Sequence, residues 1–230
     1  MAPTGVGMGG VIGDILPLAL GVAISPIPII AAILMLLSPN ARTTSIGFLA
    51  GWIAGVVIAV TAFTLLSSLL LEEDPNASKP VQGTIKLVLG ALLLVLAVKQ
   101  WRGRPHGGAP PELPKWMSAI DTLTPVKGLG LGVLLSALNP KNLIMAAGAG
   151  VVIGKSDLST GQIVVVIVVY TAIAASTVAV PVVAYLVVAD RMAQPLEALR
   201  TWLVRENTTV MAVLLLVIGV VMIGKGIGSF

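Results

Sequence analysis

Residues 20–33 read LGVAISPIPIIAAI, an apolar run that Ser25, Pro26 and Pro28 interrupt at its centre. Apolar residues continue on both sides, and the stretch 14–37 is long enough for a membrane-spanning helix, which needs about 20 residues to cross about 30 Å of hydrocarbon. Serine is a favoured N-cap and proline fits the first helical position, whereas neither helps to continue a helix. The stretch therefore predicts a membrane helix that breaks near its middle.

The composition of the whole chain also indicates a membrane protein. Of its 230 residues, 57% are hydrophobic and 10% are charged, whereas an ordinary soluble domain is about a quarter charged. The apolar residues are mostly Leu, Val, Ile, Ala and Gly, in runs far longer than the strands of a β-barrel. Only helices and closed barrels satisfy their own backbone in lipid. We therefore expect an all-α integral membrane protein.

Hydropathy predicts six transmembrane helices, at residues 14–37, 46–71, 81–99, 128–153, 161–189 and 208–227. The longest connection between them is rich in Pro and Gly, which is typical of a linker. We predict a first three-helix repeat at 1–99, a cytoplasmic linker with an amphipathic segment at 100–127, and a second three-helix repeat at 128–230.

The fourth predicted span resembles the first. Residues 131–147 read LGVLLSALNPKNLIMAA and again place a polar residue before a proline, here Asn139 and Pro140, after an LGV lead. With three helices in each half, the halves enter the membrane in opposite senses, as in the inverted repeats of many transporters. We predict two inverted repeats whose first helices are both broken at mid-membrane.

Positive charge predicts the orientation. Nine of the 14 Lys and Arg residues lie in connections that share one side of the membrane: Arg42, Lys99, Arg102, Arg104, Lys115, Lys127, Arg191, Arg200 and Arg205. The positive-inside rule then places the central linker in the cytoplasm and both termini outside.

The two breaks also predict a binding site. A half-helix that begins inside the bilayer directs free N–H groups and a positive dipole end toward the midplane. Lys141 follows the second break, and a lysine near the bilayer centre costs about 3 kcal/mol, so it needs a polar cavity or a partner. These groups favour an anion such as phosphate, sulfate or carboxylate. The alternative is a structural kink with a snorkelling lysine. The predicted substrate-binding residues are Ser25, Pro26, Pro28, Asn139, Pro140, Lys141 and Asn142.

Ser176, Thr177 and Pro181 in the fifth span form a predicted second wall, although Ser and Thr often bond their own helix backbone instead. Asp14 lies at the mouth of the first span, where a helix dipole alone would favour a carboxylate and proton coupling is the alternative.

Repeats of small residues and amphipathic stripes give two further predictions. Glycines at every fourth residue, Gly47, Gly51, Gly55 and then Gly150 and Gly154 after Ala146, predict close helix packing. Two basic stretches carry apolar stripes that are typical of segments lying on headgroups, either as simple anchors or to recruit lipid. These stripes are Trp116, Ile120 and Leu123, then Met192, Leu196, Leu199 and Leu203.

Several classes of chemistry are disfavoured. The chain has no cysteine and one histidine, so disulfides, Fe–S clusters and haem are not expected, and we predict no cofactor and no metal site. No mid-span position offers a carboxylate, histidine or thiol as a general acid or base, so an enzyme is not expected. We also expect no nucleic-acid partner.

The stretches SPIPIIAAILMLLSP (25–39), GFLAGW (47–52) and ALNPKNL (137–143) resemble the GAP family, the glycolipid and peptidoglycolipid addressing proteins of the lysine-exporter superfamily. The resemblance implies inverted three-helix repeats, location in a bacterial plasma (inner) membrane, and export, with GAP members associated with delivering glycolipids to the mycobacterial surface. The acidic motifs of the metal-transporting branches and the paired cysteines of the thiol-transferring branch are absent from this chain.

Three functions stay open at this point. The first is a transporter that exports or flips an anionic or polar-headed lipid or glycolipid across the plasma membrane. The second is an exporter of a small amphiphile such as an amino acid, which needs a closed aqueous pocket. The third is a non-transporting membrane assembly factor. The corresponding partners are membrane lipids or glycolipids, a second copy in a homodimer, and a lipid-synthesis or lipid-export protein.

Overall fold

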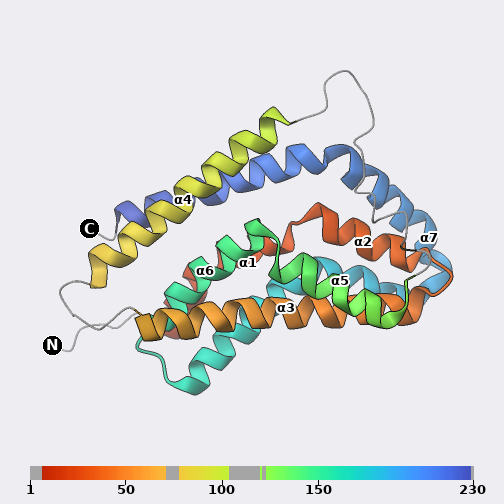
Figure 1. Cartoon of the computed structure of the whole chain (residues 1–230). Helices are drawn as coiled ribbons and strands as arrows, with labels where there is room; N and C mark the ends of the chain where they lie inside the picture. Colours follow the sequence, from red (N-terminus) through yellow and green to blue (C-terminus); the bar gives the residue numbers. More distant parts are fainter. Residues whose placement is uncertain (1–6, 71–77, 104–119, 121–122, 229–230) are drawn as a thin grey trace.

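The computed structural model describes residues 7–70, 78–103, 120 and 123–228, and all regular elements in these ranges are helical, as predicted (Figure 1). The helices are α1 (Met8–Ala23), α2 (Pro26–Leu36), α3 (Ala41–Leu70), α4 (Ser78–Arg102), α5 (Pro125–Ala137), α6 (Pro140–Gly154) and α7 (Thr160–Ile227).

Four helical segments are long and apolar enough to cross a membrane by themselves, namely Ala41–Leu69, Gly83–Arg102, Thr160–Ala189 and Arg191–Ile227. The pairs α1 with α2 and α5 with α6 pass the same test together and bend by 52° and 64°, which gives six spans if each bent pair is one span. The chain is a multi-pass membrane protein. The last span begins well before the predicted residue 208, because the basic stretch that follows Val188 is helical as well.

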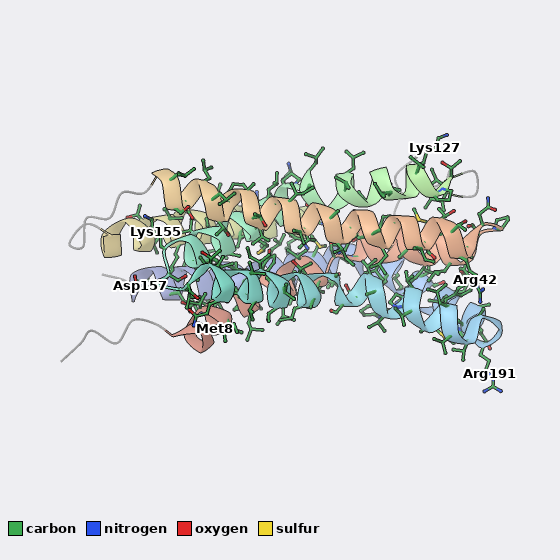
Figure 2. All side chains as sticks on the ribbon, turned by 90° about the horizontal axis from the view of Figure 1, so that it is seen from below. Met8, Arg42, Lys127, Lys155, Asp157 and Arg191 are labelled. Carbon is green, nitrogen blue, oxygen red and sulfur yellow. The ribbon has the colours of Figure 1, made fainter. Side chains whose placement is uncertain are left out.

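The successive spans run in alternating directions. The start of α1 and the end of α7 lie at one end of the molecule, and α7 turns back at Val188, where the backbone leaves the helical region (Figure 1). Figure 2 shows Lys155 and Asp157 at the same end as Met8. Arg42, Lys127 and Arg191 lie at the opposite end (Figure 2). The connections after α2, before α5 and within α7 therefore share one end.

The backbones of α3 and α5 touch because glycines line their contact. A Cβ on Gly51 would overlap the carbonyl oxygen of Leu129, and one on Gly132 would overlap the backbone of Phe48. In α6, a Cβ on Gly150 would lie 2.5 Å from the Cβ of Phe63 in α3. The predicted packing role of the glycine repeats is confirmed, since no larger residue fits at these positions.

Most of the described residues of the two apolar stripes pack inside the protein. Ile120, Leu196 and Leu203 are buried in the hydrophobic core, and Leu123 and Met192 pack against it. The prediction that these stripes lie on headgroups is wrong for the buried residues, because an apolar face alone does not distinguish a lipid surface from a protein core. Leu199 is exposed, and Trp116 lies outside the described residues.

Helix α4 continues to Arg102 and α5 begins at Pro125. The first and last residues of the predicted linker, 100–127, are therefore helical. Arg104 and Lys115 lie outside the described residues.

Substituting Gly51 with alanine tests the backbone contact between α3 and α5. We expect the free energy of unfolding to fall by about 1–3 kcal/mol, because the new methyl group forces the helices apart. The matched control is Gly130→Ala in α5, where a Cβ meets nothing within 4 Å. Thermal unfolding in detergent measures both variants, and equal melting temperatures would contradict the proposed packing.

Candidate functional site

The helices are interrupted where the sequence predicts, between α1 and α2 and again between α5 and α6. Ser25 is the N-cap of α2 and Pro26 is its first residue, while Asn139 and Pro140 take the same positions in α6. The Asn139 side chain accepts a hydrogen bond from the Lys141 backbone N–H at 3.0 Å. Proline offers no N–H group to the preceding helix, and each of these prolines follows a favoured N-cap residue, so each span ends and restarts inside its bent pair.

Lys141 binds the end of α1. Its Nζ donates to the carbonyl oxygen of Gly21 at 2.6 Å and to that of Ile24 at 3.5 Å, and the residue is 4% exposed. The last carbonyls of a helix lack partners within it and form its negative dipole end. The Lys141 ammonium therefore caps the C-terminal end of α1. The sequence alone did not identify this partner.

Thr177 reinforces the same end from α7. Its Oγ1 donates to the carbonyl oxygen of Ala23 at 2.5 Å. Ser176, in contrast, donates to Ile173 of its own helix at 2.7 Å, which is the alternative considered for this residue type. Lys141 and Thr177 thus connect α6 and α7 to the break in α1.

The N-terminal ends of α2 and α6 offer few donors to an anion. Pro26 and Pro28 occupy the first turn of α2 and Pro140 begins α6, and proline has no N–H group. The N–H of Lys141 is already bonded to Asn139. Anion binding at these breaks therefore depends on side chains more than on backbone N–H groups. The shortage of backbone donors could have been predicted from the sequence, because the positions of the prolines show which N–H groups are missing.

A small cavity with three polar residues in its wall lies beside the second break. It has about 10 Å³ and is lined in part by Ser136, Asn142 and Tyr170. The Asn142 Nδ2 donates to the Leu135 carbonyl oxygen at 3.2 Å, while Asn142 Oδ1 and the Tyr170 hydroxyl find no hydrogen-bond partner among the residues that the structure describes. The cavity has room for about one water molecule.

A larger apolar groove runs between α1–α2 and α7. It consists of two cavities, of about 420 and 810 Å³, that share Ile24 and Val210. We call this feature the apolar groove. Its first cavity is lined by Ile24, Pro26, Ile29, Ser176, Thr177, Val180, Pro181, Leu199, Trp202, Leu203 and Val210. Its second cavity is lined by Gly13, Leu16, Pro17, Leu20, Ile24, Thr209, Val210, Val213, Leu214, Val217, Ile218 and Val221.

The groove is long and opens sideways. Leu199 and Val221 are 22 residues apart in α7, about 33 Å along a helix that rises about 1.5 Å per residue. The hydrocarbon core of a bilayer is about 30 Å thick. The wall residues Leu20, Trp202 and Val217 are 47%, 53% and 54% exposed. The lining residues of the apolar groove therefore span a length similar to the thickness of the hydrocarbon core, and part of its wall is exposed at the surface of the protein.

The predicted site residues fall into two groups. Pro26 joins the predicted second wall of Ser176, Thr177 and Pro181 in lining the apolar groove. The other six line neither of its cavities: Ser25, Pro28, Asn139, Pro140, Lys141 and Asn142. Sequence reasoning missed the α7 wall around Trp202 and Val210, because apolar lining residues look like any membrane helix.

Within the described ranges, no three His, Cys, Asp or Glu side chains cluster to hold a metal ion.

The sequence model of a family described as Sap, sulfolipid-1-addressing protein, matches residues 15–228. No curated protein and no solved structure matches the chain significantly.

Replacing Lys141 with methionine tests its role at the end of α1. The variant leaves the Gly21 and Ile24 carbonyls without this donor, and an unpaired buried acceptor costs about 1–3 kcal/mol, so we expect the free energy of unfolding to fall by that amount. Lys127→Met, at an exposed lysine in α5, is the matched control and should unfold like the wild type. Thermal unfolding in detergent that fails to separate the two variants would count against the role of Lys141.

Proposed function

This chain belongs to the sulfolipid-1-addressing protein family, and we propose that it exports or flips an anionic, polar-headed lipid or glycolipid across the plasma membrane. The family name refers to addressing of a sulfolipid, which is a lipid with an anionic headgroup. The apolar groove between α1–α2 and α7 is the observation that carries the proposal.

In this proposal the groove holds the lipid tail. Its length along α7 is similar to the thickness of the hydrocarbon core, and its walls are almost entirely apolar. Because the groove opens sideways, a tail enters from the bilayer without crossing water. The headgroup then moves along the groove while the tail keeps apolar surroundings.

The polar groups near the middle of the groove are the proposed headgroup contacts. The hydroxyl-bearing Ser176 and Thr177 line the groove beside Pro26. Ile24 belongs to both cavities, and its carbonyl oxygen accepts from the Lys141 ammonium. A headgroup at Ile24 therefore lies next to a positive charge. In this proposal the charge of Lys141 attracts an anionic headgroup toward Ile24 while the ammonium stays bonded to the α1 carbonyls.

The alternatives have less support. An amino acid needs an enclosed polar pocket, and the cavity at Asn142 and Tyr170 has only about 10 Å³. Recruitment of an assembly partner through the apolar stripes is disfavoured because Ile120, Leu196 and Leu203 are buried in the core. A homodimer and a lipid-synthesis or lipid-export partner stay predictions, as does the absence of enzymatic activity.

We further propose that both termini lie outside and that the central linker is cytoplasmic. The grouping of Arg42, Lys127 and Arg191 at one end of the molecule supports this orientation (Figure 2). The two bent pairs, each followed by two more spans, support the inverted repeat. Membership of the lysine-exporter superfamily stays part of the same proposal.

Filling the groove tests the proposed function. Val217→Trp places a large side chain against its wall, and we expect it to slow lipid movement in proteoliposomes at least several-fold. The matched control is Val95→Trp in α4, at a residue that is 65% exposed and lines neither cavity of the groove. The measurement is the rate at which a fluorescent anionic lipid changes leaflet. A wild-type rate no faster than that of protein-free liposomes, or equal rates for wild type and Val217→Trp, would refute the proposal.

A further inference from the structure

An ion pair joins the two walls of the apolar groove. The Lys225 Nζ in α7 donates to the Asp14 Oδ1 in α1 at 2.7 Å. The two side chains are 32% and 36% exposed, so both reach solvent or headgroups as well as each other. Asp14 lies in the second turn of α1 rather than at its first residues, so the pairing with Lys225, and not the helix N-terminus, explains its position.

The pair lies at the end of the groove. Asp14 directly follows Gly13, the first lining residue of α1, and precedes the lining residue Pro17 by three positions. Lys225 follows Val221, the last lining residue of α7, by four positions. Residues three or four apart share a helix face. Lys225 therefore continues the α7 wall by one helical turn, while Asp14 lies at the last lining turn of α1, and the ion pair joins the two helices at the end of the groove.

This end carries the start of α1 and the end of α7. Asp14 belongs to the same helix as Met8, which lies with Lys155 and Asp157 at one end of the molecule (Figure 2). Arg42 and Arg191 mark the opposite end. In the proposed orientation, the Asp14–Lys225 pair is at the outer surface of the membrane, where an exported lipid leaves the groove.

The chemistry of the pair suits an exchange of anions. The lysine ammonium is a compact charge with three donors, which binds a sulfate or phosphate ester as readily as a carboxylate. Exposed ion pairs contribute little to stability, so giving up the Asp14 partner costs little. If a headgroup replaces the carboxylate, Lys225 stays paired throughout, and Asp14 becomes hydrated at the surface.

We propose that Lys225 is the outer headgroup site of the groove, and that a sulfate or phosphate ester of the lipid displaces the Asp14 carboxylate from it. The inference rests on the proposed function, because it needs a lipid in the groove. Asp14 competes with the headgroup for Lys225, and this competition favours release of the lipid at the outer surface.

Two substitutions with opposite expected effects test the site. The full chain is placed in phosphatidylcholine nanodiscs, and phosphatidylglycerol of the same chain length competes with a groove-bound fluorescent lipid. We expect Lys225→Met to lower the preference for phosphatidylglycerol over phosphatidylcholine at least threefold, because the cation is lost. We expect Asp14→Asn to raise this preference, because the competing carboxylate is lost. Lys155→Met, at the same end of the molecule, is the matched control and should leave the preference unchanged.

The outcomes separate the site from a simple structural link. Both variants break the ion pair. If the pair is only a structural link, the two variants should have similar melting temperatures and should not shift the lipid preference in opposite directions. That combination of results would overturn the inference. Even if the inference is overturned, the proposed function still holds when Val217→Trp reduces the total amount of bound lipid. The proposed function fails when Val217→Trp leaves the amount of bound lipid unchanged. Inorganic sulfate at the concentration of phosphatidylglycerol should not displace the lipid, and displacement would overturn the assignment to a lipid headgroup.

Discussion

The bond between the Lys141 ammonium and the Gly21 carbonyl oxygen is the interaction on which the rest of the structure depends. A helix that stops inside a membrane leaves carbonyl groups without partners, and lipid supplies none. A buried lysine is costly for the opposite reason, because it carries a charge that needs a partner. Placing the ammonium at the negative end of α1 satisfies both groups at once. By placing Lys141 beside it, α6 therefore stabilises the break in α1.

The groove follows from this arrangement. Thr177 bonds the Ala23 carbonyl from α7, and Trp52 Nε1 donates to the Ala174 carbonyl at 3.4 Å, which links α3 to α7. Glycine contacts hold α3 against α5 and α6 on the other side. The bend between α1 and α2 is thus held between packed helices. Its open side, toward the last span, is where the apolar groove forms.

The sequence predicts the parts of this fold that local patterns encode. Long apolar runs indicate the spans, and Ser25-Pro26 and Asn139-Pro140 mark the breaks. The partner of Lys141 was not predictable, because Gly21 is 120 residues away and offers only a backbone carbonyl. The groove was invisible for a similar reason, since Val210 and Val217 look like any lipid-facing residues. The stripes around Ile120 and Leu196 show that an amphipathic pattern does not say whether its partner is lipid or protein.

A lipid in the groove is the central claim, and native mass spectrometry of the full chain extracted from its own membrane tests it most directly. We expect each chain to retain one lipid with an anionic headgroup, which is enriched over its share in the bulk membrane and is lost when Val217 is replaced with tryptophan. Chains that emerge free of lipid, or that carry lipids only in bulk proportion whatever residue occupies position 217, would contradict it.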